Sequence, residues 1–405
     1  MDDARPRVSD REALPRGNLL RRILGLAREQ VGLEAAVLAE FTEGQEVVHS
    51  VDGDVDAFGL LQGSKLFFQE GFSIKAFESR PFGLIPDVRA DPRLRDILAN
   101  GFAELGSYIG APVFLPDGRV WGSLFCLGRE PATSLDERDV RMLETLGRLA
   151  GEELDRRERE GEEIALKLRR VRRTIERGIV VHFQPICDLR SSAPIGVEAL
   201  TRFDGTPHRS PDKWFAEAAE VGLGVDLEVI AARAALDSLP MLPKDAFVSV
   251  NASPQAIVSS RFLDMIRGYP GERVVVELTE HVEVENYVFL NAALATLRGR
   301  GVRIAVDDLG AGFASLRHVL RLRPDVIKLD ITLTRDIDAD PVRRALATSF
   351  ISFADDIHAE IVAEGIETSG ELEALRALGV PKGQGFFLAR PAPLEVLRLP
   401  ERPAC

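Results

Sequence analysis

Five acidic residues lie near the ends of apolar runs in the C-terminal half of the sequence: Glu198, Glu277, Asp307, Asp308 and Glu364. If these carboxylates meet in the folded chain, they repel one another and raise one another's pKa, so only bound cations make the cluster favourable. No Cys or His belongs to the set, which favours Mg²⁺ or Mn²⁺ over zinc. Five oxygen donors suffice for two ions, an arrangement that suits in-line phosphoryl displacement.

Lys328 ends another apolar run, and an ammonium group beside carboxylates can activate water or balance charge. Asp307 and Asp308 are neighbours in RIAVDDLG (303–310). We expect the strand to end between them, with Asp307 closing the strand and Asp308 opening the loop. Any one of the three glutamates, taken singly, could instead form a structural ion pair.

Eight strand-like apolar runs alternate mostly with helical stretches over residues 179–398, and these elements would position the acidic residues. The runs cover 180–186, 196–203, 246–253, 274–280, 303–310, 325–331, 360–367 and 384–389. This order predicts an α/β fold, a (β/α)8 TIM-like barrel, whose active site lies at the C-terminal ends of its strands. Gln184, Asn251 and Gln384 add polar side chains to that predicted edge.

Residues 179–398 resemble the EAL-domain phosphodiesterases, which hydrolyse the bacterial second messenger cyclic di-GMP. The motifs that carry the resemblance occur in the family order: FQPI (183–186), GVEALTRF (196–203), VNASP (250–254), VELTE (276–280), VDDLGAGFASL (306–316), DVIKLD (325–330), AEGIET (363–368) and GQGFF (383–387). The resemblance implies a barrel that binds cyclic di-GMP as substrate and releases linear pGpG.

The same resemblance implies two metal ions, Mg²⁺ or Mn²⁺, and their ligands. One ion would be held by Glu198, Asn251, Glu277 and Asp307. The second would be held by Asp307, Asp308 and Glu364, which makes Asp307 the bridge. A hydroxide between the two ions would attack one phosphorus of the substrate.

The remaining predicted site residues also take their roles from the family. Lys328 is predicted as a catalytic residue together with Asp308 and Glu364, and it would orient the attacking water or assist its deprotonation. Arg202 would clamp a substrate phosphate. Three side chains would lie at the substrate or the water: Gln184, Gln384 and Glu367. Glu280 would tie the loop after the aspartates to the metal site.

The loop after the aspartates departs from the family pattern, which is commonly DDFGTGYSSL and here reads DDLGAGFASL (307–316). The four different positions are Leu309, Ala311, Phe313 and Ala314. They remove three hydroxyls, each of which could fix the loop by a hydrogen bond contributing about 0.5–1.5 kcal/mol. Family members with altered loops here can be weak or silent, so this loop bears on the turnover rate and on dimer coupling.

Residues 18–133 resemble a GAF domain, a regulatory α+β module that can bind small ligands and dimerise. The likeness rests on GLIPDVRADPR (83–93), on YIGAPVFLPDGRVWGSLFCLG (108–128) and on a helix that opens at SLDERDVRMLETL (134–146). Pro116-Asp117-Gly118 predicts a hairpin turn between two strands. The resemblance implies a sensor that regulates the barrel in response to a small molecule or a protein.

Residues 134–178 are predicted to form one long, charged helix, which begins with a capping box at Ser134 and Glu137. Alternating steps of four and three mark a seam that is apolar at both ends: Leu143, Gly147, Ala150, Leu154, Arg157, Gly161, Ile164, Leu168, Val171 and Ile175. The seam predicts a parallel dimer stalk, with a solvated connector helix as the alternative. We therefore expect a homodimer through this helix and the barrel.

The composition of the 405-residue chain limits its partners and its location. A net charge of −13 argues against a DNA-binding surface. Three widely spaced Cys residues fit a reducing cytoplasm. No uncharged run is long enough for a membrane helix, and residues 1–17 are predicted to be a flexible tail and not a secretory signal.

Three functions are compatible with this sequence. The favoured one is an active cyclic di-GMP phosphodiesterase controlled by the GAF-like domain. The alternative is a silent or weak cyclic di-GMP receptor that signals through the long helix to a partner. Retention of Glu198, Lys328 and Glu364 speaks against it, because a receptor needs no hydrolytic water. The third is a metal-dependent barrel enzyme that acts on another phosphodiester.

Overall fold

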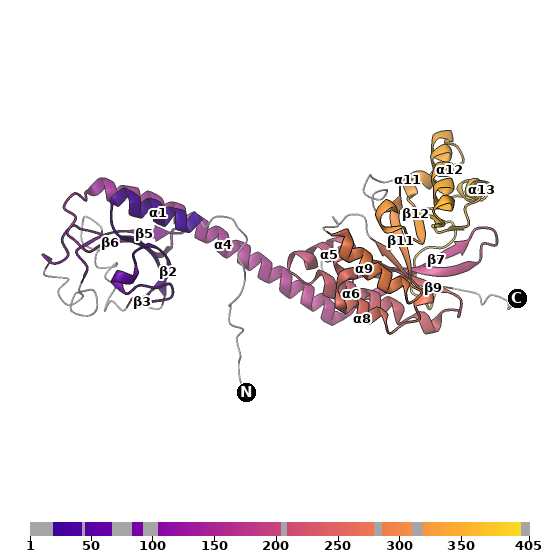
Figure 1. Cartoon of the computed structure of the whole chain (residues 1–405), viewed down its shortest axis with the longest axis horizontal. Coiled ribbons are helices and arrows are strands. Elements are labelled where there is room, and N and C mark those ends of the chain that lie inside the picture. The colour runs from indigo at the N-terminus through magenta and orange to yellow at the C-terminus, as the bar shows by residue number, and fades with distance from the viewer. Residues whose placement is uncertain are drawn as a thin grey trace, which may run out of the picture. The chain divides into compact units, whose positions relative to one another are not determined.

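The chain divides into two compact units, and the boundary in the sequence falls between Glu163 and Ile164 (Figure 1). The computed structural model describes residues 19–42, 45–66, 83–91, 104–203, 209–278, 286–309 and 319–397, apart from the side chain of Asp308. The predicted tail at 1–17 lies outside the described residues.

Within its described residues, the N-terminal unit contains a six-stranded sheet in the order β3-β2-β1-β6-β5-β4. The strands are β1 (Ala35–Thr42), β2 (Gln45–Gly53), β3 (Lys65–Leu66), β4 (Leu84–Ile85), β5 (Ser107–Phe114) and β6 (Val120–Gly128), and a short 3-10 helix η1 (Asp56–Phe58) follows β2. The predicted hairpin is confirmed, because β5 and β6 pair antiparallel on either side of 116–118. Gly118 there has φ +88°, which favours glycine.

This sheet buries apolar side chains on both faces, as the alternation of side chains along each strand requires. One face packs against α1 (Leu19–Val31) and against the long helix α4 (Glu137–Arg177). This core includes Leu24, Leu38, Ile109, Leu124 and Leu143. The other face carries a second core, which includes Val37, Phe58, Leu60, Tyr108 and Phe125. The predicted α+β organisation is therefore confirmed.

The predicted long helix is also confirmed, as α4 (Glu137–Arg177), whose 41 residues run from one unit into the other (Figure 1). The predicted capping box at Ser134 is wrong, because the helix begins at Glu137 and the Asp136 backbone N–H donates to the Asp139 carboxylate at 2.9 Å. Much of its apolar seam is used within the chain. Leu143, Ala150 and Leu154 are buried in the core of the N-terminal unit, and Val171 is buried beside Trp214 in the C-terminal unit. The seam residues near both ends therefore have packing partners of their own, and the dimer remains a prediction.

The C-terminal unit contains a closed barrel of eight strands, in the order β10-β11-β12-β13-β14-β7-β8-β9. They are β7 (Val180–Asp188), β8 (Pro194–Arg202), β9 (Phe247–Ala252), β10 (Val274–Leu278), β11 (Arg303–Leu309), β12 (Val326–Leu329), β13 (Glu360–Ala363) and β14 (Lys382–Gly383). The predicted eight-stranded barrel is confirmed.

Two details of the barrel differ from the sequence-based prediction. Strand β7 pairs antiparallel with both of its neighbours and joins β8 by a hairpin, so its C-terminal end lies at the opposite end of the barrel from those of the other strands. The eighth strand is the short pair 382–383 and not 384–389, because the chain turns directly after Gly383. The apolar run FFL (386–388) suggests a strand, but Phe386 and Phe387 are exposed in the turn that follows Gly383.

The interior of the barrel is layered. Along β9 to β13, every second side chain points inward, and one interior layer, here called the apolar layer, consists of Ile186, Phe247, Val275, Ala305, Val326 and Val362. Toward the C-terminal end of each of these strands, the next inward residue is polar or charged. On β9, Ser249 follows Phe247, and Asn251 follows Ser249. Two positions after the layer residues of β10 to β13 come Glu277, Asp307, Lys328 and Glu364. The acidic side chains and Lys328 thus lie together at one end of the interior, separated by the apolar layer from the ion pairs of Glu360 with Arg303 and Lys382 at the other end.

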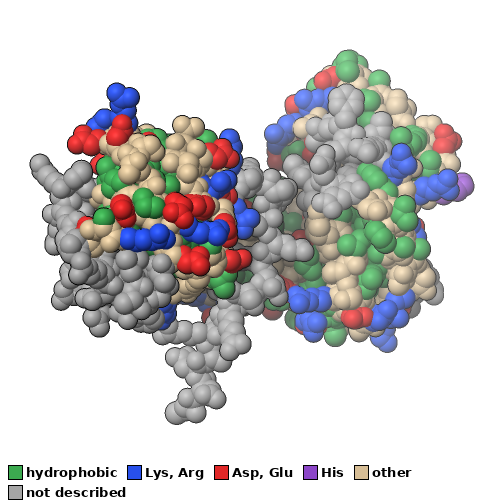
Figure 2. All heavy atoms as spheres, turned by 60° about the vertical axis from the view of Figure 1, so that its left-hand side comes forward, with side chains coloured by type: hydrophobic (Ala, Val, Ile, Leu, Met, Phe, Trp, Pro, Cys, Tyr) green, Lys and Arg blue, Asp and Glu red, His purple; other side chains and the backbone are tan. Residues whose placement is uncertain are grey.

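Helices cover the outside of the barrel (Figure 1). They are α5 (Pro211–Glu220), α6 (Gly224–Leu236), α7 (Pro254–Val258), α8 (Ser260–Ile266), α9 (Tyr287–Arg298), α11 (Ile331–Thr334), α12 (Pro341–Asp356) and α13 (Ser369–Ala377), with the 3-10 turns η3 (Leu239–Met241) and η4 (Gly271–Arg273). Among the described helices of the chain, none has the length and apolar character to cross a membrane. Figure 2 shows basic and acidic side chains interspersed over the described surface in view.

Candidate active site

Lys328 lies at the centre of the charged end of the barrel, surrounded by carboxylates from four other strands. Its Nζ is 2.6 Å from Glu364 Oε1, 2.8 Å from Glu277 Oε2, 3.2 Å from Asp307 Oδ1 and 3.3 Å from Glu198 Oε2. The lysine is 1% exposed. The structure therefore brings four of the predicted acidic residues and the predicted lysine to one point.

Two amide side chains extend this cluster. Gln384 Nε2 donates to Glu198 Oε2 at 2.6 Å and to Glu364 Oε1 at 3.0 Å. Asn251 Nδ2 lies 3.4 Å from Glu198 Oε1, so the atom that Asn251 can offer a cation is its carbonyl oxygen. Both predicted amides therefore belong to the same site as the carboxylates.

Burial and crowding shift the pKa values of the site in favour of shared protons or a bound cation. Burial raises the pKa of Glu277, and the neighbouring Glu198 and Asp307 carboxylates raise it further, against the opposing effect of Lys328. Burial also raises the pKa of Glu364. Lys328 behaves in the opposite way, since burial alone would lower its pKa but the surrounding carboxylates outweigh burial and raise it. The four carboxylates exceed the single ammonium by three negative charges when all are ionised.

The donor chemistry of this cluster fits Mg²⁺ or Mn²⁺. The converging atoms are carboxylate oxygens, which these hard cations prefer. Gln384 Oε1 is a further buried oxygen that makes no hydrogen bond to the described residues. Among the described side chains, no three Asp, Glu, His or Cys residues are already spaced as ligands of one ion. Lys328 Nζ lies between the carboxylates, so a cation bound there would take the place of Nζ as their partner.

Asp307 and Asp308 do not lie on either side of the strand end, as the sequence predicts, because β11 continues to Leu309. The pairing with β12 shifts between Val306 and Leu309, which is the mark of a bulge. Simple alternation from Ala305 and Asp307 would turn Leu309 inward. The bulge instead places Leu309 in the core outside the barrel, with Val306 and Leu329.

Other predicted site residues lie further from Lys328 or outside the described residues. Gln184 is in the middle of antiparallel β7, opposite Glu198, and its Nε2 donates to the Ala389 carbonyl at 3.2 Å. Arg202 ends β8, and its Nη1 donates to the Thr201 carbonyl at 2.9 Å. Glu280, the side chain of Asp308 and residues 310–318, including Ala311, Phe313 and Ala314, lie outside the described residues.

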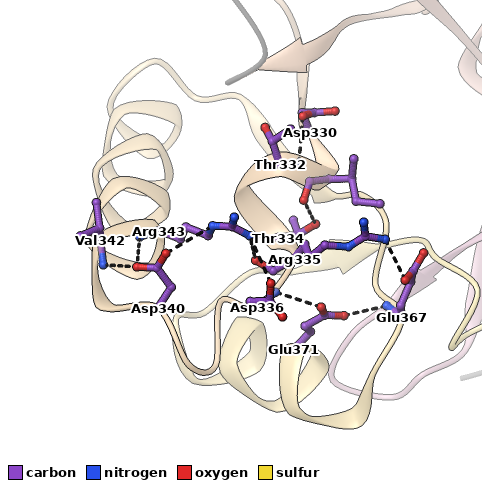
Figure 3. Close-up of polar contacts among 11 residues, drawn as sticks. Asp330, Thr332, Thr334, Arg335, Asp336, Asp340, Val342, Arg343, Glu367 and Glu371 are labelled. Atoms are coloured by element: carbon purple, nitrogen blue, oxygen red, sulfur yellow. Dashed lines mark hydrogen bonds and ion pairs between the residues drawn. The ribbon is translucent and has the colours of Figure 1, made fainter.

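Glu367 belongs to a polar network beside the site, not to the carboxylate cluster (Figure 3). Its Oε2 is 2.8 Å from Arg335 Nη2. The buried Glu371 carboxylate accepts backbone N–H groups from Asp336, Glu367 and Thr368 at 2.8–3.0 Å. The network thus joins the segment after β12 to the segment that carries Glu364.

Three supporting residues were not identified from the sequence. Thr334 donates from its hydroxyl to the backbone carbonyl of Glu364, and Glu371 anchors the segment after it. Ser249 Oγ donates to Glu277 Oε1 at 2.5 Å. The capping box formed by Thr368 and Glu371 could have been found from their spacing. Ser249 could have been found as a polar residue two positions before Asn251, on the same face of the strand.

Comparisons with known proteins identify the families to which the two units are similar. The family model of the EAL domain matches residues 168–391, and that of the GAF domain matches residues 13–155. The bifunctional diguanylate cyclase/cyclic di-GMP phosphodiesterase MucR of Pseudomonas aeruginosa is 29% identical over 240 residues, which are 56% of this chain and 35% of that protein. The probable cyclic di-GMP phosphodiesterase PdeD of Escherichia coli is 30% identical over 220 residues, 52% of this chain and 41% of that protein.

A solved structure of the PaMucR phosphodiesterase in complex with c-di-GMP is 28% identical, with a TM-score of 0.51. The aligned region covers 57% of this chain and 98% of the solved chain. The matched region spans less than half the length of the two curated relatives.

Proposed function

Because the chain belongs to the EAL domain family, we propose that it hydrolyses cyclic di-GMP to linear pGpG. The observation that carries the proposal is the convergence of Glu198, Glu277, Asp307 and Glu364 on one point at the C-terminal halves of the barrel strands. A barrel that needed only stability would not gather two buried and two partly buried carboxylates there, since each carries a desolvation cost.

In the proposed site, Glu198, Asn251, Glu277 and Asp307 would hold one Mg²⁺ or Mn²⁺, and Asp307, Asp308 and Glu364 would hold a second. When bound, such ions polarise a phosphoryl oxygen and lower the pKa of water. The reaction adds a water oxygen to one phosphorus and breaks its bond to the 3′ oxygen, which takes up a proton as the ring opens.

The other side chains orient the reactants. Lys328 Nζ contacts Glu277 and Glu364, and with cations as the partners of these carboxylates it would be able to donate to the attacking water or to a phosphate oxygen. Gln384 lies within hydrogen-bond distance of both Glu198 and Glu364, where its amide can position the same water. Arg202 at the end of β8 clamps a phosphate, while Gln184 and Glu367 contact the substrate further out.

The test is to incubate the purified chain with cyclic di-GMP and Mn²⁺ or Mg²⁺ and to separate the nucleotides by chromatography. We expect pGpG to form, and we expect Glu198→Ala to abolish its formation. Glu360→Ala is the matched control, because Glu360 pairs with Lys382 at the opposite end of the barrel. Binding of cyclic di-GMP without formation of pGpG would favour a receptor. If the chain neither binds nor hydrolyses cyclic di-GMP, an enzyme that acts on another phosphodiester would be favoured.

The proposal includes regulation by the GAF domain and a homodimer. The observation that supports regulation is the continuity of α4, which supplies Leu154 to one core and Val171 to the other. Gly161 lies between them, and a Cβ there would meet no atom within 4 Å. Gly161→Pro breaks the helix and Gly161→Ala strengthens it. We expect the proline variant to change the rate of pGpG formation by several-fold and the alanine variant to change it much less.

A further inference from the structure

We propose that Ser249 is a positioning residue that holds Glu277 in the orientation needed to bind a divalent cation. Ser249 lies on β9 between Phe247, which belongs to the apolar layer, and Asn251 of the candidate site. It is fully buried. The inference rests on the proposed metal binding at this site.

Ser249 is out of place among its neighbours in the barrel interior. The inward residues beside it in the apolar layer include Ile186, Val275, Ala305 and Val326. A hydroxyl group in such surroundings is unfavourable unless it makes a hydrogen bond. The Ser249 hydroxyl makes that bond to the Glu277 carboxylate, with Oγ 2.5 Å from Oε1.

The two oxygens of Glu277 have separate partners. Oε1 accepts from Ser249, while Oε2 is 2.8 Å from Lys328 Nζ at the centre of the site. Ser249 therefore holds the carboxylate from the apolar side and leaves Oε2 directed toward the other acidic side chains. A cation that replaces Lys328 as the partner of Oε2 meets an oxygen that is already aimed.

Residues that hydrogen-bond a metal ligand from outside typically change metal affinity by about 10–100-fold when they are lost. Loss of the Ser249 hydroxyl would also leave Glu277 Oε1 buried without a donor, because Glu277 is only 1% exposed. A small void adjoins the serine, and its lining includes Val275, Val326, Glu277 and Lys328.

Two substitutions of the same shape can be compared at this position. Ser249→Thr keeps the hydroxyl and adds a methyl group, whereas Ser249→Val has the threonine shape without the hydroxyl. Mn²⁺ binding to the full chain can be measured from the loss of the free Mn²⁺ signal in electron paramagnetic resonance, with no substrate present. Thermal unfolding of each variant checks its folding.

We expect Ser249→Thr to bind Mn²⁺ within about threefold of the unmodified chain and Ser249→Val to bind it about 10–100-fold more weakly. The control is Ser238→Ala, which removes a buried hydroxyl bonded to the Ala235 carbonyl at 2.6 Å, in the turn after α6. It should leave Mn²⁺ affinity unchanged. Equal affinities of the threonine and valine variants would overturn the positioning role, as would an unmodified chain that binds no Mn²⁺.

The pGpG assay separates this inference from the proposed function. If the unmodified chain forms no pGpG but the valine variant alone loses Mn²⁺ affinity, the proposed reaction is wrong and the role of Ser249 stands. If pGpG forms and the two variants bind Mn²⁺ equally, the reaction stands and the role of Ser249 is wrong.

Discussion

Glu153 in the N-terminal unit and Glu277 in the barrel are both buried, but their pKa values shift in opposite directions. In the N-terminal unit, Glu153 is 5% exposed and is 2.6 Å from Arg156 and 2.7 Å from Arg157. Burial alone would raise its pKa, but hydrogen bonds from the two arginines outweigh burial and lower it. In the barrel, burial and neighbouring carboxylates raise the pKa of Glu277 despite its contact with Lys328.

The local balance of charge differs between the two sites. Glu153 has two cations for one carboxylate, so its charge is satisfied within the chain. The barrel site has one cation for four carboxylates, so it is stable only if protons or metal ions supply the missing positive charge. An unbalanced buried cluster is thus a stronger indication of a ligand than a buried acid by itself.

Removal of the single cation from the barrel site should have the largest effect. With Lys328→Met, four carboxylates lose their shared partner, and the free energy of unfolding in the presence of a chelator should fall by about 3–5 kcal/mol. Formation of pGpG should fall by about 10²–10⁴-fold. Urea unfolding and the nucleotide assay measure the two effects.

The control for this substitution is Lys382→Met, which removes a lysine paired with Glu360 at the other end of the barrel. Its rate should stay within a few-fold of the unmodified chain. If the Lys328→Met variant in chelator is as stable as the unmodified chain, the four carboxylates do not need the charge of Lys328. The contrast in charge balance between the barrel site and Glu153 would then be wrong.

A smaller effect is expected where a carboxylate is satisfied by backbone groups. Glu371 accepts three backbone N–H groups, and Glu371→Ala would leave these donors without their acceptor. The free energy of unfolding should fall by about 1–3 kcal/mol. Glu371→Gln, which keeps one acceptor oxygen, should lose less. The exposed Glu373, on the same helix, provides the control Glu373→Ala, and equal losses at the two positions would contradict the anchoring role.

The smallest effect is expected in the N-terminal unit. Glu153→Gln removes two ion pairs within one helix, at spacings of three and four residues. Such pairs contribute about 0.3–0.5 kcal/mol each, so the loss should be about 0.5–1 kcal/mol by urea unfolding. Glu160→Gln, at a more exposed partner of Arg156, should cost less. A loss at Glu153 as large as that of Lys328→Met would remove the distinction between balanced and unbalanced burial.

Much of the fold could be predicted from the sequence because it depends on local patterns. The apolar runs predict seven of the eight barrel strands and the turn at 116–118 predicts the β5–β6 hairpin, since alternation and turn chemistry act over a few residues. The direction of β7 was not predicted. A hairpin and a crossover both connect two strands, and the choice between them depends on how the barrel closes.

The candidate site was predictable in its membership and less so in its geometry. Residue type and position at strand ends indicated Glu198, Glu277, Asp307, Lys328 and Glu364, and these side chains meet. The bulge in β11 was not visible, because it is a mismatch of register between two strands. The partners of Arg202 and Gln184 were likewise not predictable, since each bonds to a backbone carbonyl.

The sequence by itself determined which residues carry charge and on which strands they lie, because side chains alternate along a strand with a fixed period. Only the tertiary structure decided that Lys328 lies among four carboxylates and that Ser249 supports one of them. Contacts within the site join residues up to 186 positions apart, as between Gln384 and Glu198. Closure of the barrel brings such residues within hydrogen-bond distance, and no pattern along the chain encodes that distance.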